Sequence, residues 1–161
     1  MISSQKESSE RGILGTVVRT RDLLLETWHD LREAVQRIDV LLWDAIETET
    51  GLGAAESEVL ARLLNEPGHV MPMTRLADEV SFSSGGFTKL ADRLEADGLI
   101  ERRADPADRR VRNAALTHEG ERLAKLVMAL VTRGLRRQLL APLGEDGVRT
   151  LATLLARLDP E

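Results

Sequence analysis

The segment from residue 73 to 117 constrains the fold more than any other part of the chain. Apolar residues recur at helical spacing twice in it, around Leu76 and around Leu90, with only a short connection between the two runs. Gly98 can end the second run in a left-handed conformation, and two strand-like stretches then flank the turn residues 105–108. This order predicts two short helices followed by a small β-hairpin.

Arginines gather at this predicted hairpin. Residues 102–112 contain five arginines and two aspartates, whereas residues 1–80 contain 8 basic and 15 acidic side chains. Because charges more than about 10 Å apart are screened at moderate salt, the local surplus matters more than the net charge of -5. Two adjoining helices with a basic hairpin are typical of a winged helix-turn-helix that binds duplex DNA. A hairpin that simply carries solvated charge is the alternative.

The second helix of the pair has a predicted core face and a predicted polar face. Ser83 is placed to cap it, and Phe82 and Phe87 occupy the two positions of a hydrophobic staple. We expect Leu90, Ala91 and Leu94 to face the core. The residues left for solvent or a DNA groove are Ser84, Gly85, Thr88, Lys89, and Asp92 or Arg93.

Gly85 and Gly86 stand in the first turn of this helix. Each glycine costs about 1 kcal/mol in helix propensity and offers no side chain to a base edge. Two interpretations remain open: the helix backbone approaches DNA phosphates closely, or the glycines are tolerated at a frayed helix start.

Both ends of the chain carry long apolar stripes. Leu24, Trp28, Leu31, Val35, Ile38 and Leu42 follow one another at spacings of 4, 3, 4, 3 and 4, which predicts a helix over 16–48. Thr117 can cap a further helix that Ala141 and Pro142 end, and a last helix begins near residue 145. So much apolar surface exceeds what one small domain covers, which predicts a homodimer joined through 16–48 and 118–158.

These patterns predict one domain over residues 1–161, mainly α with a small β-hairpin wing. The winged helix-turn-helix lobe is expected over 54–117. Without cysteine, disulfides, thiolate catalysis and Cys-ligated zinc are excluded. His29, His69 and His118 have no paired spacing, and no Ser-His-Asp order, phosphate loop or HExxH motif occurs, so we expect neither a metal, a cofactor nor an enzyme. No apolar run approaches the roughly 20 residues that span a bilayer, so we expect a cytoplasmic protein without membrane association.

The chain resembles the MarR family of transcriptional regulators over roughly residues 20–158. The resemblance lies in the order and spacing of five pieces: Leu76-Ala77-Asp78, Thr88-Lys89-Leu90-Ala91-Asp92-Arg93-Leu94-Glu95, Gly98-Leu99-Ile100, Asp105-Pro106-Ala107-Asp108-Arg109-Arg110 and Leu116-Thr117-His118-Glu119-Gly120. It implies a twofold dimer whose recognition helices enter successive major grooves while the wings reach adjacent minor grooves. It also implies that Arg110 is the wing-tip arginine and that Asp108 helps to hold the wing.

We therefore expect a ligand-responsive repressor that binds an inverted-repeat operator of double-stranded DNA. A winged-helix module that binds other proteins, without specific DNA binding, is the alternative. The resemblance further implies a small aromatic or phenolic anion as effector, which Trp28 and His29 could contact, although Trp28 also fits the apolar seam. The residues expected at DNA are Ser83, Ser84, Gly85, Gly86, Thr88, Lys89, Arg93, Asp108, Arg109 and Arg110.

Overall fold

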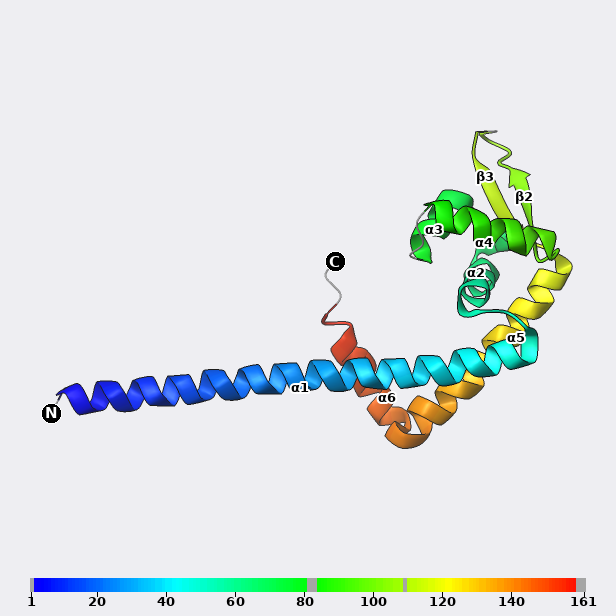
Figure 1. Ribbon diagram of the computed structural model, residues 1–161. Helices are drawn as coiled ribbons and strands as arrows, with labels where there is room; N and C mark the ends of the chain where they lie inside the picture. The colour runs from blue at the N-terminus through cyan, green and yellow to red at the C-terminus, as the bar shows by residue number, and fades with distance from the viewer. Residues whose placement is uncertain (1, 81–83, 109, 159–161) are drawn as a thin grey trace. The chain divides into compact units, whose positions relative to one another are not determined.

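The computed structural model describes residues 2–80, 84–108 and 110–158, with side chains from residue 21 onward except that of Ser84 (Figure 1). The described chain is mainly helical with one three-stranded antiparallel sheet. It divides into two compact units, Met1–Val40 and Leu41–Glu161. No helix in the described residues is both long enough and apolar enough to cross a membrane.

The described residues of the first unit all belong to helix α1, which spans Ile2–Thr50. The predicted start at residue 16 was wrong, because the helix begins 14 residues earlier, at Ile2. The first residues are mostly polar, so they carry no apolar periodicity from which a helix could be predicted. Within residues 21–40 the seam residues Leu24, Trp28, Leu31 and Val35 are exposed, and Ile38 is half-buried.

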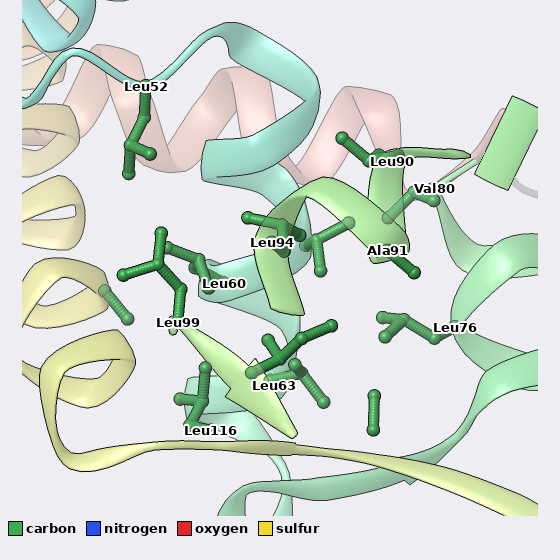
Figure 2. Close-up of a cluster of buried hydrophobic side chains, with 14 of the residues drawn as sticks. Leu52, Leu60, Leu63, Leu76, Val80, Leu90, Ala91, Leu94, Leu99 and Leu116 are labelled. Atoms are coloured by element: carbon green, nitrogen blue, oxygen red, sulfur yellow. The ribbon is translucent and has the colours of Figure 1, made fainter. Parts of the chain in front are cut away.

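Three helices of the second unit surround a common core. They are α2 (Ala54–Asn65), α3 (Met73–Glu79) and α4 (Ser84–Ala96). Leu60 and Leu63 from α2, Leu76 from α3 and Leu94 from α4 are fully buried there, as Figure 2 shows. These residues repeat at helical spacing in each segment, so one apolar face of each helix is removed from water.

The sheet has three strands rather than the two of the predicted hairpin. Strands β2 (Ile100–Ala104) and β3 (Arg112–Leu116) form the hairpin, and β1 (Val70–Pro72) pairs with the other edge of β3. The strand β1 was missed because three residues ending in a proline give no recognisable alternation. Pro72 is tolerated there because it ends an edge strand. The central strand β3 therefore anchors the hairpin to the core, with Ala114, Ala115 and Leu116 buried.

Two long helical segments follow the sheet. Helix α5 (His118–Leu135) is capped by Thr117, whose Oγ1 accepts the Gly120 N–H at 3.0 Å, which confirms the predicted cap. A π-helical turn, η2 (Arg136–Leu140), leads into α6 (Ala141–Leu155). The chain does not break at Ala141 and Pro142, as predicted, but at Gly144, whose φ is +67°. The last helical stretch then follows from residue 145, near its predicted start. Pro142 is accepted in the first turn of α6, where a missing N–H costs little.

Gly120 allows close packing between two parts of the second unit. A Cβ atom at this position would lie 1.8 Å from the backbone oxygen of Leu99 and 3.3 Å from Leu116 Cδ2. The same Leu99 oxygen accepts the Thr117 N–H at 3.1 Å, and Thr117 Oγ1 donates to the Gly98 oxygen at 2.6 Å. The start of α5 is thus pressed against the segment that joins α4 to β2.

Asp105 organises the loop between β2 and β3. Its Oδ1 accepts the Ala107 and Asp108 N–H groups at 2.8 and 3.1 Å, and its Oδ2 accepts Asn113 Nδ2 at 3.0 Å. The Asn113 amide, followed by these two backbone N–H groups, holds the pKa of the Asp105 carboxyl below its usual range. The loop that carries the wing tip is therefore fixed by an ionised carboxylate.

We predict that Gly120→Ala destabilises the protein, although alanine normally favours a helix. The methyl group would overlap a backbone atom. We therefore expect the free energy of unfolding to fall by about 1–3 kcal/mol or more, the usual cost of overpacking. Gly85→Ala is the matched control, since a Cβ there meets nothing within 4 Å. It should instead gain up to about 1 kcal/mol. Thermal and urea unfolding measure both, and equal stability of the two variants would contradict this packing.

We predict that the wing loop loosens in acid. Since the folded-state pKa of Asp105 lies below the unfolded-state value, its stabilising contribution is complete above about pH 3.9 and is lost as the pH falls through the folded-state pKa. The NMR amide signals of Ala107 and Asp108 should therefore shift with a midpoint below that of an ordinary aspartate. Asp105→Asn should remove this transition. A midpoint at or above the ordinary value would show that the loop does not depend on the carboxylate.

Candidate nucleic-acid interface

Helix α4 divides into the two predicted faces. Leu90, Ala91 and Leu94 are buried in the core, which confirms the predicted inner face (Figure 2). Phe87 is buried as well. The opposite side exposes Gly85, Thr88, Lys89, Asp92 and Arg93. Three residues of the sequence analysis, Phe82, Ser83 and Arg109, lie outside the described residues, and so does the side chain of Ser84.

Glycine at position 85 is not required by packing within the chain. The residue is exposed in the first turn of α4, and a Cβ there would have open space around it. Its backbone is helical, so no positive φ demands glycine either. The remaining consequence of a missing side chain is that another molecule can approach the helix backbone closely.

Two of the predicted wing arginines are neutralised inside the lobe. Arg102 on β2 donates to Asp92 Oδ1 at 2.6 Å and to Glu95 Oε2 at 2.9 Å, both on α4. Arg103 pairs with Glu101 on its own strand. Arg102 therefore joins the hairpin to α4, and neither arginine contributes much net positive charge to a partner.

Other cations remain available on the same lobe. Lys89 on α4, Arg110 in the wing loop and Arg112 at the start of β3 are exposed and form no ion pair with any described residue. The Arg110 N–H donates to Asp108 Oδ1 at 2.9 Å, so Asp108 fixes the backbone that carries this arginine. The β2–β3 hairpin projects from the lobe beyond α4 (Figure 1). Arg112 was not among the predicted DNA contacts, although the arginine run already contained it.

Arg93 differs from these cations, because its guanidinium is already paired. It donates to Glu56 Oε1 on α2 at 2.9 Å. Glu56 was missed in the sequence analysis, and the signal that could have shown it is its position three residues after Gly53, the spacing of a capping box. The structure thus ties one predicted DNA contact to the start of α2.

The residues expected at an effector are exposed on one helix. Trp28, with 57% of its surface accessible, lines a shallow groove of about 300 Å³ together with Leu31, Arg32, Val35 and Gln36. His29 is exposed and does not line this groove. Trp28 and His29 therefore do not line one common groove in the described residues.

A separate cavity of about 420 Å³ lies within the second unit, between the last turns of α1 and the end of α5. Leu42 packs so closely on α5 there that a Cβ at Gly134 would lie 2.1 Å from Leu42 Cδ2. At the rim, Arg133 donates to Glu49 at 2.5 Å. Among the described residues no group of three His, Cys, Asp or Glu side chains can hold a metal ion.

Comparison with known proteins points to one family. The model of the MarR family matches residues 50–111, which include α2, α3, α4, β2 and the hairpin loop. The regulator MhqR of Bacillus subtilis (strain 168), described as an HTH-type transcriptional regulator, is 36% identical over 70 residues, or 44% of this chain. The match spans about half the length of that curated relative, 47%.

Solved structures extend the likeness over most of the chain. A probable transcriptional regulator from Pseudomonas aeruginosa is 32% identical, with 80% of this chain and 93% of that chain covered and a TM-score of 0.66. A mutant of MarR from E. coli, complexed with operator DNA, is 28% identical, with 81% and 91% covered and a TM-score of 0.69. Members of this family are transcriptional regulators and not enzymes. With a winged helix, a matching family model and these relatives, the chain belongs to the MarR family of transcriptional regulators.

Proposed function

We propose that this protein is a sequence-specific regulator that binds an inverted-repeat DNA operator as a homodimer. The observation that carries the proposal is the distribution of unpaired positive charge. On an acidic chain, Lys89, Arg110 and Arg112 are exposed together on the lobe that carries α4 and the hairpin. Phosphates attract such local charge whatever the net charge of the molecule.

The exposed face of α4 fits the major groove. That groove is about 12 Å wide and admits one helix, whose first turns contact base edges and phosphates. We assign Ser83, Ser84, Thr88 and Lys89 to polar contacts there. Gly85 and Gly86 would let the helix start approach a phosphate with its backbone.

The wing fits the neighbouring minor groove. Arg110 would enter it, because a narrow A·T-rich groove has an enhanced negative potential. Asp108 would hold the arginine's backbone, and Arg109 would contribute to the charge at the same tip. The E. coli MarR mutant that was solved with operator DNA supports this mode of binding for a relative of the same family.

The apolar surface supports a twofold dimer. Helix α6 has no buried residue, and Leu143, Leu154, Leu155 and Leu158 near the C-terminus are exposed. In the first unit Leu24, Leu31 and Val35 are exposed in the same way. Exposed apolar surfaces of this kind are covered in the functional assembly. A second copy of the chain would cover them with the same apolar surfaces of its own.

Regulation by a small anion is part of the proposal. The family resemblance suggests an aromatic or phenolic carboxylate, for which Trp28 and His29 were the predicted contacts. The cavity lined by Leu42, Leu130 and Arg137 offers a second place, with apolar walls and a guanidinium group, while its Arg133 is already paired with Glu49. A ligand bound there would change the affinity for DNA only if it binds the DNA-bound and the DNA-free states of the protein with different affinities. We propose a repressor, which acts on DNA in the cytoplasm.

A winged-helix module that binds only proteins is the competing function. It would use the same fold, but it would not show the counterion release of phosphate contacts. The affinity for duplex DNA should fall steeply with salt if Lys89, Arg110 and their neighbours reach phosphates. Binding to a fluorescent random duplex at several salt concentrations therefore separates the two functions.

We predict that Lys89→Ala and Arg110→Ala weaken DNA binding in different ways. The duplex is one that the wild-type protein selects from a randomised library. Lys89→Ala should cost about 1–3 kcal/mol if the side chain reaches a base, with reduced discrimination at that position. Arg110→Ala should reduce affinity mainly where A·T pairs flank the half-sites.

Arg103→Ala serves as the matched control for these variants, because it removes a wing arginine that is paired with Glu101. Its effect should be smaller than that of Arg110→Ala. Half-sites in the selected duplex should lie about one helical turn, roughly 10 bp, apart. Unchanged affinity in both the Lys89 and the Arg110 variants, with the protein folded, would reject this interface.

We predict a dimer in solution. Sedimentation equilibrium at micromolar concentration should give about twice the monomer mass of 17.8 kDa. Leu154→Asp and Leu155→Asp place a charge on the exposed apolar face of α6 and should shift the equilibrium toward the monomer. A wild-type monomer at these concentrations would contradict both the dimer and the inverted repeat.

A further inference from the structure

Glu56 contacts two different parts of the lobe with its two oxygens. Its Oε2 accepts the Gly53 N–H at 2.7 Å, which satisfies a donor at the start of α2. Its Oε1 accepts Arg93 from α4 at 2.9 Å. The Glu56 side chain is only 13% exposed, whereas that of Arg93 is 70% exposed. The carboxylate is therefore the fixed partner, and the arginine reaches to it.

Gly53 lets this carboxylate sit close to the helix start. A Cβ on residue 53 would lie 3.2 Å from Glu56 Oε2, tighter than ordinary contact. The Gly53 carbonyl in turn accepts the Ser57 N–H at 3.0 Å. The position of Glu56 is thus set by the first turn of α2 and not by its ion pair with α4.

Helix α4 is also bonded to β2, through Asp92, the neighbour of Arg93, and through Glu95. Asp92 and Glu95 bind Arg102 of β2, at 2.6 and 2.9 Å. Consecutive residues of one helix are therefore bonded in two directions, Arg93 to α2 and Asp92 to β2. A change in the tilt of α4 lengthens at least one of these pairs.

The place of Arg93 along α4 suits positioning better than base reading. It follows Ser84 by nine residues, or roughly 13 Å along a helix axis. Recognition helices contact base edges mainly with their N-terminal residues. A paired arginine this far from the helix start lies beyond the turns that would enter the groove.

We propose that Glu56 is a positioning residue for DNA recognition, which holds Arg93 and so sets the tilt of α4 against the duplex. The inference rests on the proposed function. An ion pair with so exposed an arginine adds little to stability, so its larger effect is on the orientation of the helix that meets DNA. Specific binding depends on that orientation, whereas binding to random DNA depends mainly on charge.

The variant Glu56→Gln tests this role. A glutamine oxygen can still accept the Gly53 N–H, as in a capping box, but the neutral amide loses the ion pair. We expect affinity for the duplex selected by the wild-type protein to fall about 2- to 30-fold, the range for residues that act through others. Affinity for a random duplex of the same length, at the same salt, should not fall, because it follows charge and the variant removes a negative one. In the double variant Glu56→Gln/Arg93→Gln, the ratio of selected-duplex affinity to random-duplex affinity should fall little further, because both substitutions break the same ion pair.

Glu58→Gln is the matched control, since it removes the same charge from α2 but breaks only a pair with Arg62 on the same helix. It should leave the selected-to-random ratio unchanged. An unchanged ratio in Glu56→Gln, or an equal change on both duplexes, would overturn the inference while leaving DNA binding intact. If Glu56→Gln does not fold, Arg93→Gln breaks the pair from its exposed side and is read by the same ratio. Failure of the wild-type protein to bind any duplex would instead reject the proposed function.

Discussion

The contact between Gly120 and the backbone of Leu99 determines how the winged-helix lobe is assembled. At this point the end of α4, the start of β2, the end of β3 and the start of α5 meet, and Thr117 closes the junction with hydrogen bonds to Gly98 and Leu99. Only glycine fits, because a Cβ atom would lie 1.8 Å from a carbonyl oxygen. The hairpin, α4 and the long helix α5 therefore leave this junction in set directions, which the proposed binding surface requires.

Ion pairs within the lobe determine which lysine and arginine side chains remain available to a binding partner. Arg102 and Arg93 are used inside the lobe, where they bind α4 to β2 and to α2. Lys89, Arg110 and Arg112 form no ion pair with any described residue. This division explains how a chain with net charge -5 can present a positive surface, and it separates the arginines that orient the helix from those proposed to meet phosphates.

Much of the fold could be predicted because its signals are local. The core face of α4, the Thr117 cap and the glycine that ends α4 follow from spacing and backbone preference, and Gly98 has the expected φ of +71°. Strand β1 and the break at Gly144 could not be predicted, because a three-residue strand is set by pairing with β3 and a proline is tolerated at a helix start. The pairing of Arg93 with Glu56 joins residues 37 positions apart, and no local pattern reports such a contact.

Amide hydrogen exchange with and without duplex DNA tests the central claim most directly, because it reports the contacted backbone along the whole chain. The duplex is the one that the wild-type protein selects from a random library. We expect protection to rise in the first turns of α4, around Gly85, Thr88 and Lys89, and in the wing loop around Arg110. Exchange in the exposed face of α6 should stay as in the free protein. Protection confined to other surfaces, with α4 and the wing unchanged, would contradict the account.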